Sequence, residues 1–150
     1  MFRASLILAV FLGGCATQYV GTIAESEDDL PVRRAFFAEP PDALSDAFRA
    51  ACDAPGDVFK SLNATTDQCL IPPTPDGAAC LLLSVDGALE APRLIMQKQS
   101  KPDGDGTLVE MSYFAEVPQK SGPARRVYFL QPRLDALVDS MLINAGGETR

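Results

Sequence analysis

The side chains best suited to nucleophilic or metal chemistry in this chain are its four cysteines, at positions 15, 52, 69 and 80, and it has no histidine. Without histidine, the Ser-His-Asp and Cys-His arrangements of nucleophilic catalysis cannot form. The chain contains no GxSxG, Walker or GxGxxG motif and no CxxC pair. We therefore expect no enzymatic activity, no cofactor and no metal site.

Two groups of carboxylates also invite a chemical interpretation. Asp103-Gly104-Asp105-Gly106 resembles part of a calcium loop, but the third ligand and the later glutamate are missing, so a hairpin turn is expected. Glu110 and Glu116 share one face of a predicted strand. Six residues of strand separate them by about 20 Å. The carboxylate pairs of glycosidases stand about 5–10 Å apart, so this pair does not match them.

The first 14 residues have the pattern of an export signal. Arg3 precedes an apolar run, Ala4–Leu12, which is too short to span a membrane. The sequence that follows, Leu12-Gly13-Gly14-Cys15, resembles the lipobox of bacterial lipoproteins. This resemblance implies a signal peptide at residues 1–14, diacylglycerol on the Cys15 thiol, cleavage before Cys15 and acylation (palmitate) of the new amine. The alternative is an ordinary cleaved signal with a chance cysteine.

A lipid on Cys15 predicts where the protein resides. Two or more acyl chains hold a protein at a membrane firmly, whereas one holds it only marginally. Ala16 follows the cysteine. By the family's sorting rule, Ala16 favours the outer membrane, with the protein facing the periplasm and the inner membrane as the alternative.

The net charge of the chain limits the kinds of partner that it is expected to bind. It has 13 basic and 20 acidic side chains and a net charge of −7, and cleavage before Cys15 removes only Arg3 among them. This acidity excludes a nucleic-acid partner, which needs basic patches, and argues against electrostatic docking to anionic lipid. It is compatible with a basic partner, although acidity also simply serves solubility.

An exported protein meets an oxidising compartment, so a disulfide is expected. Cys52 ends a predicted helix and Cys69 begins an apolar segment, and we favour a bridge between these two. A Cys69–Cys80 bridge, which would close a hairpin, is the rival. Cys80 opens the run "CLLLSV", where it reads as a small buried hydrophobe.

The domain organisation follows from changes in composition. Residues 15–41 are predicted to be lipid anchor and tether, residues 42–147 a single α+β domain, and residues 148–150 a tail. Within the tether, "VRRAFF" (32–37) does not suit a linker because two adjacent phenylalanines should not face water. It is expected to be a short strand docked on the domain, or else a segment that orders on binding a partner.

Hydrophobic periodicity predicts the elements of the domain. A helix is expected from Ala43 to about Cys52, with Asp42 as its N-cap, and another from Pro132 to a cap at Gly146. Strands are expected between them, most clearly at 107–117, where Val109 and alternate residues face one way and a mostly solvated set faces the other. The fold class is therefore α+β, with two layers: a mostly antiparallel sheet of four to five strands with an N-terminal and a C-terminal helix.

Several aromatic and basic side chains are candidates for contact with a partner. They are Phe36, Phe37, Phe114, Arg125, Arg126 and Tyr128. The alternative for either arginine is an ion pair with Glu110 or Glu116 across neighbouring strands, and the aromatic side chains could instead be core.

These observations favour a non-enzymatic lipoprotein of the cell envelope that acts through contacts with an envelope protein, as scaffold or accessory factor. A periplasmic inhibitor of a basic enzyme such as lysozyme is the first alternative, because the chain is acidic. A small-ligand carrier that uses the concave side of the sheet is the second.

Overall fold

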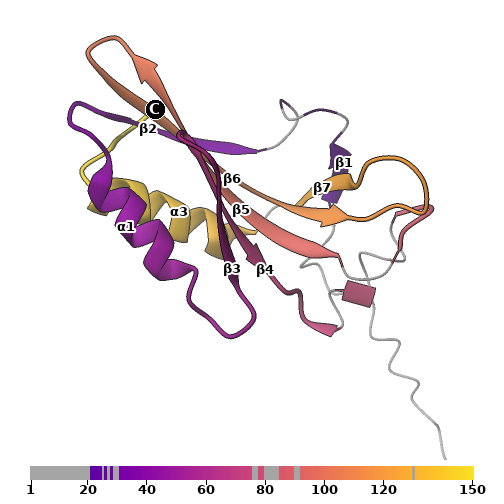
Figure 1. Ribbon diagram of the computed structural model, residues 1–150. Coiled ribbons are helices and arrows are strands. Elements are labelled where there is room, and N and C mark those ends of the chain that lie inside the picture. Colours follow the sequence, from indigo (N-terminus) through magenta and orange to yellow (C-terminus); the bar gives the residue numbers. More distant parts are fainter. Residues whose placement is uncertain are drawn as a thin grey trace, which may run out of the picture.

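The fold is built on one large antiparallel sheet. The computed structural model describes residues 21–24, 26, 28, 31–75, 78–79, 85–89, 92–129 and 131–150. They contain an eight-stranded sheet, with helices α1 (Asp42–Ala51) and α3 (Pro132–Asn144) side by side in Figure 1. The predicted α+β class with an antiparallel sheet is confirmed. The predicted size of four to five strands is wrong, because the short strands at both ends of the chain also join the sheet.

The strands are β1 (Gly21–Ala24), β2 (Val32–Phe37), β3 (Val58–Asn63), β4 (Thr66–Ile71), β5 (Arg93–Asp103), β6 (Gly106–Val117), β7 (Arg125–Phe129) and β8 (Glu148–Thr149). The main order is β1-β7-β6-β5-β4-β3. Along one edge β6 pairs with the whole of β5, through a turn in which Asp103 is opposite Gly106, as the Asp-Gly pattern predicts. Its other edge is shared, because β2 pairs with the first half of β6 and β7 with its end. β8 pairs with β2.

The start of α1 differs from the prediction. Asp42 is the first helical residue rather than the cap, and Pro41 stands at the cap position without a side-chain hydrogen bond. The Pro41 carbonyl accepts a hydrogen bond from the Ser45 amide (3.0 Å). Asp42 still favours the helix, since a carboxylate in the first turn interacts well with the helix dipole.

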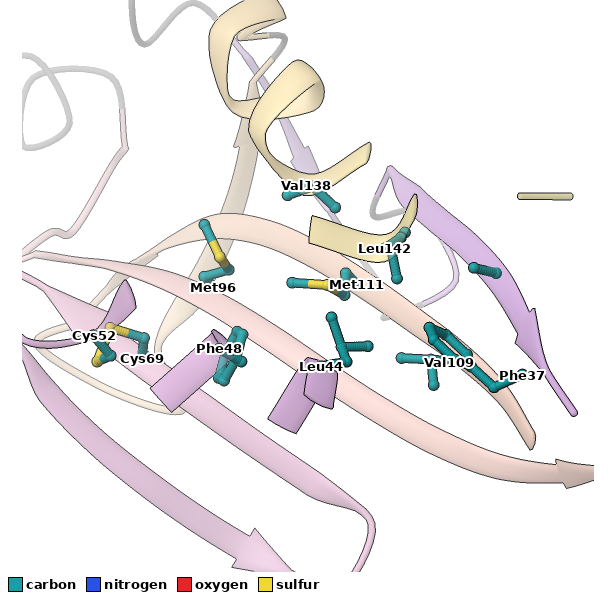
Figure 2. Close-up of a cluster of buried hydrophobic side chains, with 11 residues drawn as sticks. Phe37, Leu44, Phe48, Cys52, Cys69, Met96, Val109, Met111, Val138 and Leu142 are labelled. Atoms are coloured by element: carbon teal, nitrogen blue, oxygen red, sulfur yellow. A yellow bond between two sulfur atoms is a disulfide. The ribbon is translucent and has the colours of Figure 1, made fainter. Parts of the chain in front are cut away.

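One face of the sheet forms the core with both helices (Figure 2). Leu44 and Phe48 of α1 and Val138 and Leu142 of α3 are almost fully buried. They pack with a cluster from the sheet that includes Ala35, Phe37, Cys69, Met96, Val109 and Met111. Burying a side chain of this size stabilises the fold by about 1.5–3 kcal/mol, so this layer supplies much of the stability.

The other face of the sheet is less solvated than expected. Phe114 lies on this face and is fully buried, and Ser112 is 7% exposed. Phe114 forms a small cluster with Leu70 and Ile95, against which Tyr128 packs. The predicted alternation of side chains along β6 is confirmed, because Val109 and every second residue after it are buried. The pattern of one strand does not, however, show what covers its second face.

Both predicted flanking segments contribute to the folded domain. The predicted tether covered residues 15–41, yet β2 lies within it and pairs with β6 over six residues. The four residues of β1 pair with β7. The predicted tail, residues 148–150, includes β8, and the Arg150 amide donates to the Arg34 carbonyl (3.1 Å). β1, β2 and β8 are therefore parts of the sheet.

Two glycines end α3 and lead into β8. Gly146 has a φ of +88°, the left-handed conformation that follows many helices, so the cap prediction is confirmed. Gly147 is needed for space. A Cβ there would lie 2.6 Å from the Phe37 ring and 2.9 Å from the Leu142 carbonyl oxygen.

We expect Gly147→Ala to destabilise the fold by about 1–3 kcal/mol, because the added methyl group overpacks the junction of α3, β2 and β8. Urea unfolding measures this loss. Gly146→Ala is the matched comparison: its Cβ would meet open space, so only the strain of positive φ, about 1 kcal/mol, should appear. Equal losses at the two positions would contradict the packing explanation.

Candidate functional site

The two cysteines favoured from the sequence are bonded to each other. Cys52 follows α1, Cys69 lies in β4, and their Cα atoms are 5.7 Å apart. The rival Cys69–Cys80 bridge is therefore wrong. Asp57 lies close enough to complete a three-residue group with this pair, but both sulfur atoms are used by the disulfide, so they offer no thiolates to a metal. Cys15 and Cys80 lie outside the described residues.

Residues 32–37 form a strand of the sheet, which confirms the prediction that "VRRAFF" is a short strand docked on the domain. Phe37 is 4% exposed and belongs to the core, so it offers no surface to a partner. Phe36 is partly buried on the opposite side, where the Arg150 guanidinium lies 4.5 Å from the centre of its ring. Arg150 also pairs with Asp103 (2.9 Å). The phenylalanines therefore hold the strand in place.

The other candidates for contact with a partner also include both buried and exposed side chains. They are Phe114, Arg125, Arg126 and Tyr128. Phe114 is fully buried and cannot be a contact residue, which corrects the prediction. Arg126 lies over the Phe114 ring (4.8 Å to its centre) and pairs with Glu116 across neighbouring strands (3.8 Å), as the alternative for the arginines expected. Arg125 is exposed and Tyr128 is partly exposed. The structure thus brings together the Phe114, Arg126 and Tyr128 side chains, while Arg125 remains open to solvent.

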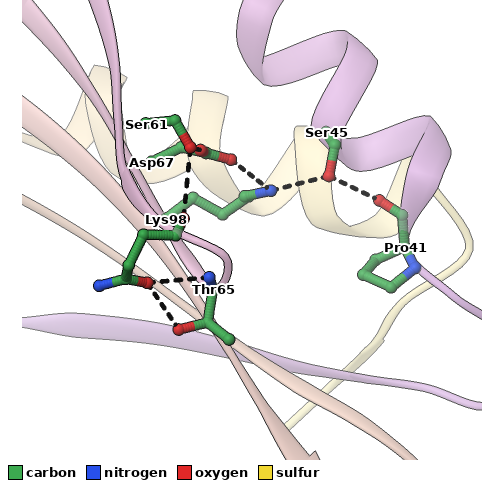
Figure 3. A network of polar contacts seen from close by, with 7 residues as sticks. Pro41, Ser45, Ser61, Thr65, Asp67 and Lys98 are labelled. Carbon is green, nitrogen blue, oxygen red and sulfur yellow. Dashed lines mark hydrogen bonds and ion pairs between the residues drawn. The ribbon is translucent and has the colours of Figure 1, made fainter.

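A buried ion pair lies between α1 and the sheet (Figure 3). The Lys98 side chain is 6% exposed, and its Nζ contacts Asp67 Oδ2 (2.9 Å) and donates to Ser45 Oγ (2.7 Å). Ser61 Oγ donates to the other Asp67 oxygen (2.8 Å). Burial of the Asp67 carboxyl opposes its ionisation, but the hydrogen bonds from Lys98 and Ser61 outweigh burial and lower the pKa of Asp67.

A polar groove of about 470 Å³ crosses the second face of the sheet. Its charged residues are largely paired: Glu110 accepts from Arg34 (2.7 Å) and Lys101 (3.0 Å). Burial raises the pKa of Glu110, but these two cations together lower it. The groove also presents the amides of Gln97 and Gln99, and Gln97 Oε1 accepts a hydrogen bond from Gln68 (2.7 Å).

Strand β3 forms an exposed edge of the sheet. Val58 and Leu62 are 46% and 53% exposed, and Lys60 between them is exposed and makes no ion pair with any described residue. Next to Val58 is an apolar groove of about 410 Å³, whose lining includes Leu70, Ile71, Pro72, Pro73 and Pro92 and one cation, Arg93. A register shift interrupts the β3–β4 pairing between Ser61 and Asn63.

Sequence patterns had not revealed the β3 edge or the Lys98–Asp67 pair. The burial of Lys98 could have been inferred from the sequence, because Leu94, Met96 and Lys98 are alternate residues of β5 and therefore share its buried face. The exposed edge carries no such local signal, since it depends on which strand ends the sheet.

Comparison of the chain with protein-family models, curated proteins and solved structures finds no match. Among the described helices, none has the length and apolar character needed to cross a membrane.

Proposed function

We propose that this chain is a non-enzymatic lipoprotein of the cell envelope, anchored through Cys15 in the outer membrane, and that it acts by binding an envelope protein at strand β3. The resemblance of residues 12–15 to a lipobox supports the anchor. The observation that carries the binding function is the exposed edge of β3, where Val58 and Leu62 are about half exposed and Val58 borders an apolar groove.

An edge strand recognises a partner by adding a strand to the sheet. Backbone hydrogen bonds supply affinity, and pockets for alternate side chains supply specificity. Val58, Lys60 and Leu62 alternate along β3, so they favour an extended segment with an acidic residue opposite Lys60 and apolar residues on either side. Lys60 and the register shift oppose pairing of β3 with another copy of itself, because edge lysines and bulges discourage such pairing.

The test compares two pairs of exposed apolar residues. Val58→Ser with Leu62→Ser changes β3, whereas Leu137→Ser with Ile143→Ser changes α3 at side chains that are 46% and 57% exposed. After crosslinking in the envelope, we expect capture of a protein that wild type captures stoichiometrically to fall about tenfold or more with the β3 variant, since truncating the few central residues that dominate an interface costs more than about 1 kcal/mol each. The α3 variant should capture it normally. Equal capture by both variants would contradict a binding role for β3.

A ligand carrier is a second candidate, favoured by the polar groove on the second face. Its volume of about 470 Å³ falls within the usual range for small-ligand sites, and Gln97, Gln99 and Ser112 offer hydrogen-bonding groups along it. Native mass spectrometry of protein released gently from envelopes would reveal a bound small molecule. Loss of that species in Gln99→Ala, with the fold intact, would support the carrier over the contact protein.

A further inference from the structure

One segment of this acidic chain is distinctly basic. Residues 118–133, here called the basic segment, contain Lys120, Arg125, Arg126 and Arg133 and no aspartate or glutamate. The chain as a whole has a net charge of −7. The segment includes β7, the strand that joins β1 to the rest of the sheet.

Three of the four cations are available to a partner. Lys120, Arg125 and Arg133 are exposed and make no ion pair with the described part of the chain. Arg126 is held by Glu116 and Phe114, as described above. Two acids flank the segment and are themselves paired: Glu116 with Arg126, and Asp135 with the Tyr113 hydroxyl, from which it accepts a hydrogen bond (2.7 Å). Asp86 is exposed and lies in the turn whose Gly87 carbonyl accepts a hydrogen bond from the Lys120 amide (3.0 Å).

The basic segment also lies close to the proposed lipid anchor. β1 begins at Gly21, and its register sets Gly21 opposite Phe129 and Ala24 opposite Arg126. Only six residue steps separate Cys15 from Gly21. A fully extended chain spans at most about 3.6 Å per residue, so the acylated cysteine can lie no more than about 22 Å from the start of β1. β1 and β7 lie together on the right in Figure 1, away from α1.

We propose that the basic segment rests against anionic lipid headgroups at the membrane in which Cys15 is anchored. This inference depends on the proposed acylation of Cys15, which brings β1 and β7 to the bilayer. The overall acidity of the chain argued against such docking, but salt screens charges beyond about 8 Å at physiological ionic strength. The charges nearest the bilayer therefore decide the contact, and in the basic segment they are positive.

The expected strength follows from the number of exposed cations. A basic residue near an anionic membrane surface strengthens the contact by about fivefold. Lys120, Arg125 and Arg133 together should favour the docked orientation by on the order of a hundredfold. The docked orientation would point β3, at the far end of the strand order from β1, away from the lipid surface.

Hydrogen exchange of the acylated full-length protein in vesicles tests this orientation. Vesicles of phosphatidylcholine are compared with vesicles that also contain phosphatidylglycerol, an anionic lipid. On anionic vesicles we expect the exposed amides of the 118–124 loop to exchange more slowly, by up to about a hundredfold where docking excludes water from them. High salt should abolish this protection. The amides of the exposed strand β3 should exchange equally in both vesicles.

Two variants that lose the same number of positive charges distinguish the effect of the basic segment from the effect of net charge. Lys120→Gln/Arg125→Gln/Arg133→Gln should lose the protection, whereas Arg49→Gln/Lys60→Gln/Lys101→Gln, at exposed cations elsewhere, should retain it. Protection that is equal on both kinds of vesicle, or lost equally in both variants, would overturn the proposal. Vesicle flotation and the intact mass test the anchor separately: a chain that floats with the expected acyl mass but leaves the loop unprotected refutes the docking alone.

Discussion

Replacing Asp67 with asparagine is expected to lower the free energy of unfolding by about 3–5 kcal/mol, because removing one partner of a buried ion pair leaves the other charge without compensation. The Lys98 side chain is only 6% exposed and would retain Ser45 as its one described partner. The loss is measured by urea unfolding at neutral pH.

Asp139→Asn provides the comparison for an exposed ion pair. Asp139 and its partner Arg33 have side chains 36% and 42% exposed, so the change should be below about 1 kcal/mol. Replacing both buried partners, Asp67→Leu with Lys98→Met, should restore much of the lost stability, because apolar residues of similar volume often substitute for buried pairs. Equal losses at Asp67 and Asp139 would contradict the importance of burial.

The same pair predicts how stability depends on pH. Because the pKa of Asp67 is lowered in the folded state, its contribution is fully present above the unfolded-state pKa of about 3.9 and is lost as the pH falls through the lower folded-state pKa. Glu110, whose pKa is also lowered, acts in the same direction. Acid destabilisation should therefore be weaker in Asp67→Asn than in wild type, measured as the change in unfolding free energy between neutral and acidic pH.

The second large effect is expected at the disulfide. Cys52→Ala with Cys69→Ala should lower the free energy of unfolding by about 3 kcal/mol, since the bridge closes a loop with a sequence separation of 17 residues. Thermal or urea unfolding measures the loss. Adding reductant to wild type should reproduce it, while the double variant should be insensitive to reductant. A double variant as stable as oxidised wild type would show that core packing alone holds α1 against β4.

Local patterns predicted those parts of the fold that short segments determine. The alternation along β6, the Asp103–Gly106 turn and the glycine cap after α3 all depend on neighbours within a few residues, and the structure has each of them. The extent of the sheet could not be predicted in this way. β1 and β8 join it through partners far along the chain, and a four-residue strand such as β1 has little pattern of its own. β2 was expected as a docked strand, but its place beside β6 was not.

For the candidate contact residues too, local patterns could not show which side chains remote elements would bury. Phe37 was correctly expected not to face water, whereas Phe114 was offered as a contact residue with the core as the alternative. Burial against remote elements decided that both are core. The ion pair of Arg126 was predictable, because Glu116 lies directly opposite on the neighbouring strand. The β3 edge emerged only from the complete strand order.

The shared edge of β6 has a consequence for how the chain acquires its structure. β2 is made early, yet its partner strand lies far downstream: Arg34 and Glu110 are 76 residues apart, and β8 must also return to β2. Such long-range pairing slows folding and leaves strands unprotected in the meantime. If the chain crosses a membrane amino terminus first, β2 cannot pair with β6 until residues 107–112 have emerged. A holding chaperone that acts during that interval would encounter β2 as an unpaired strand.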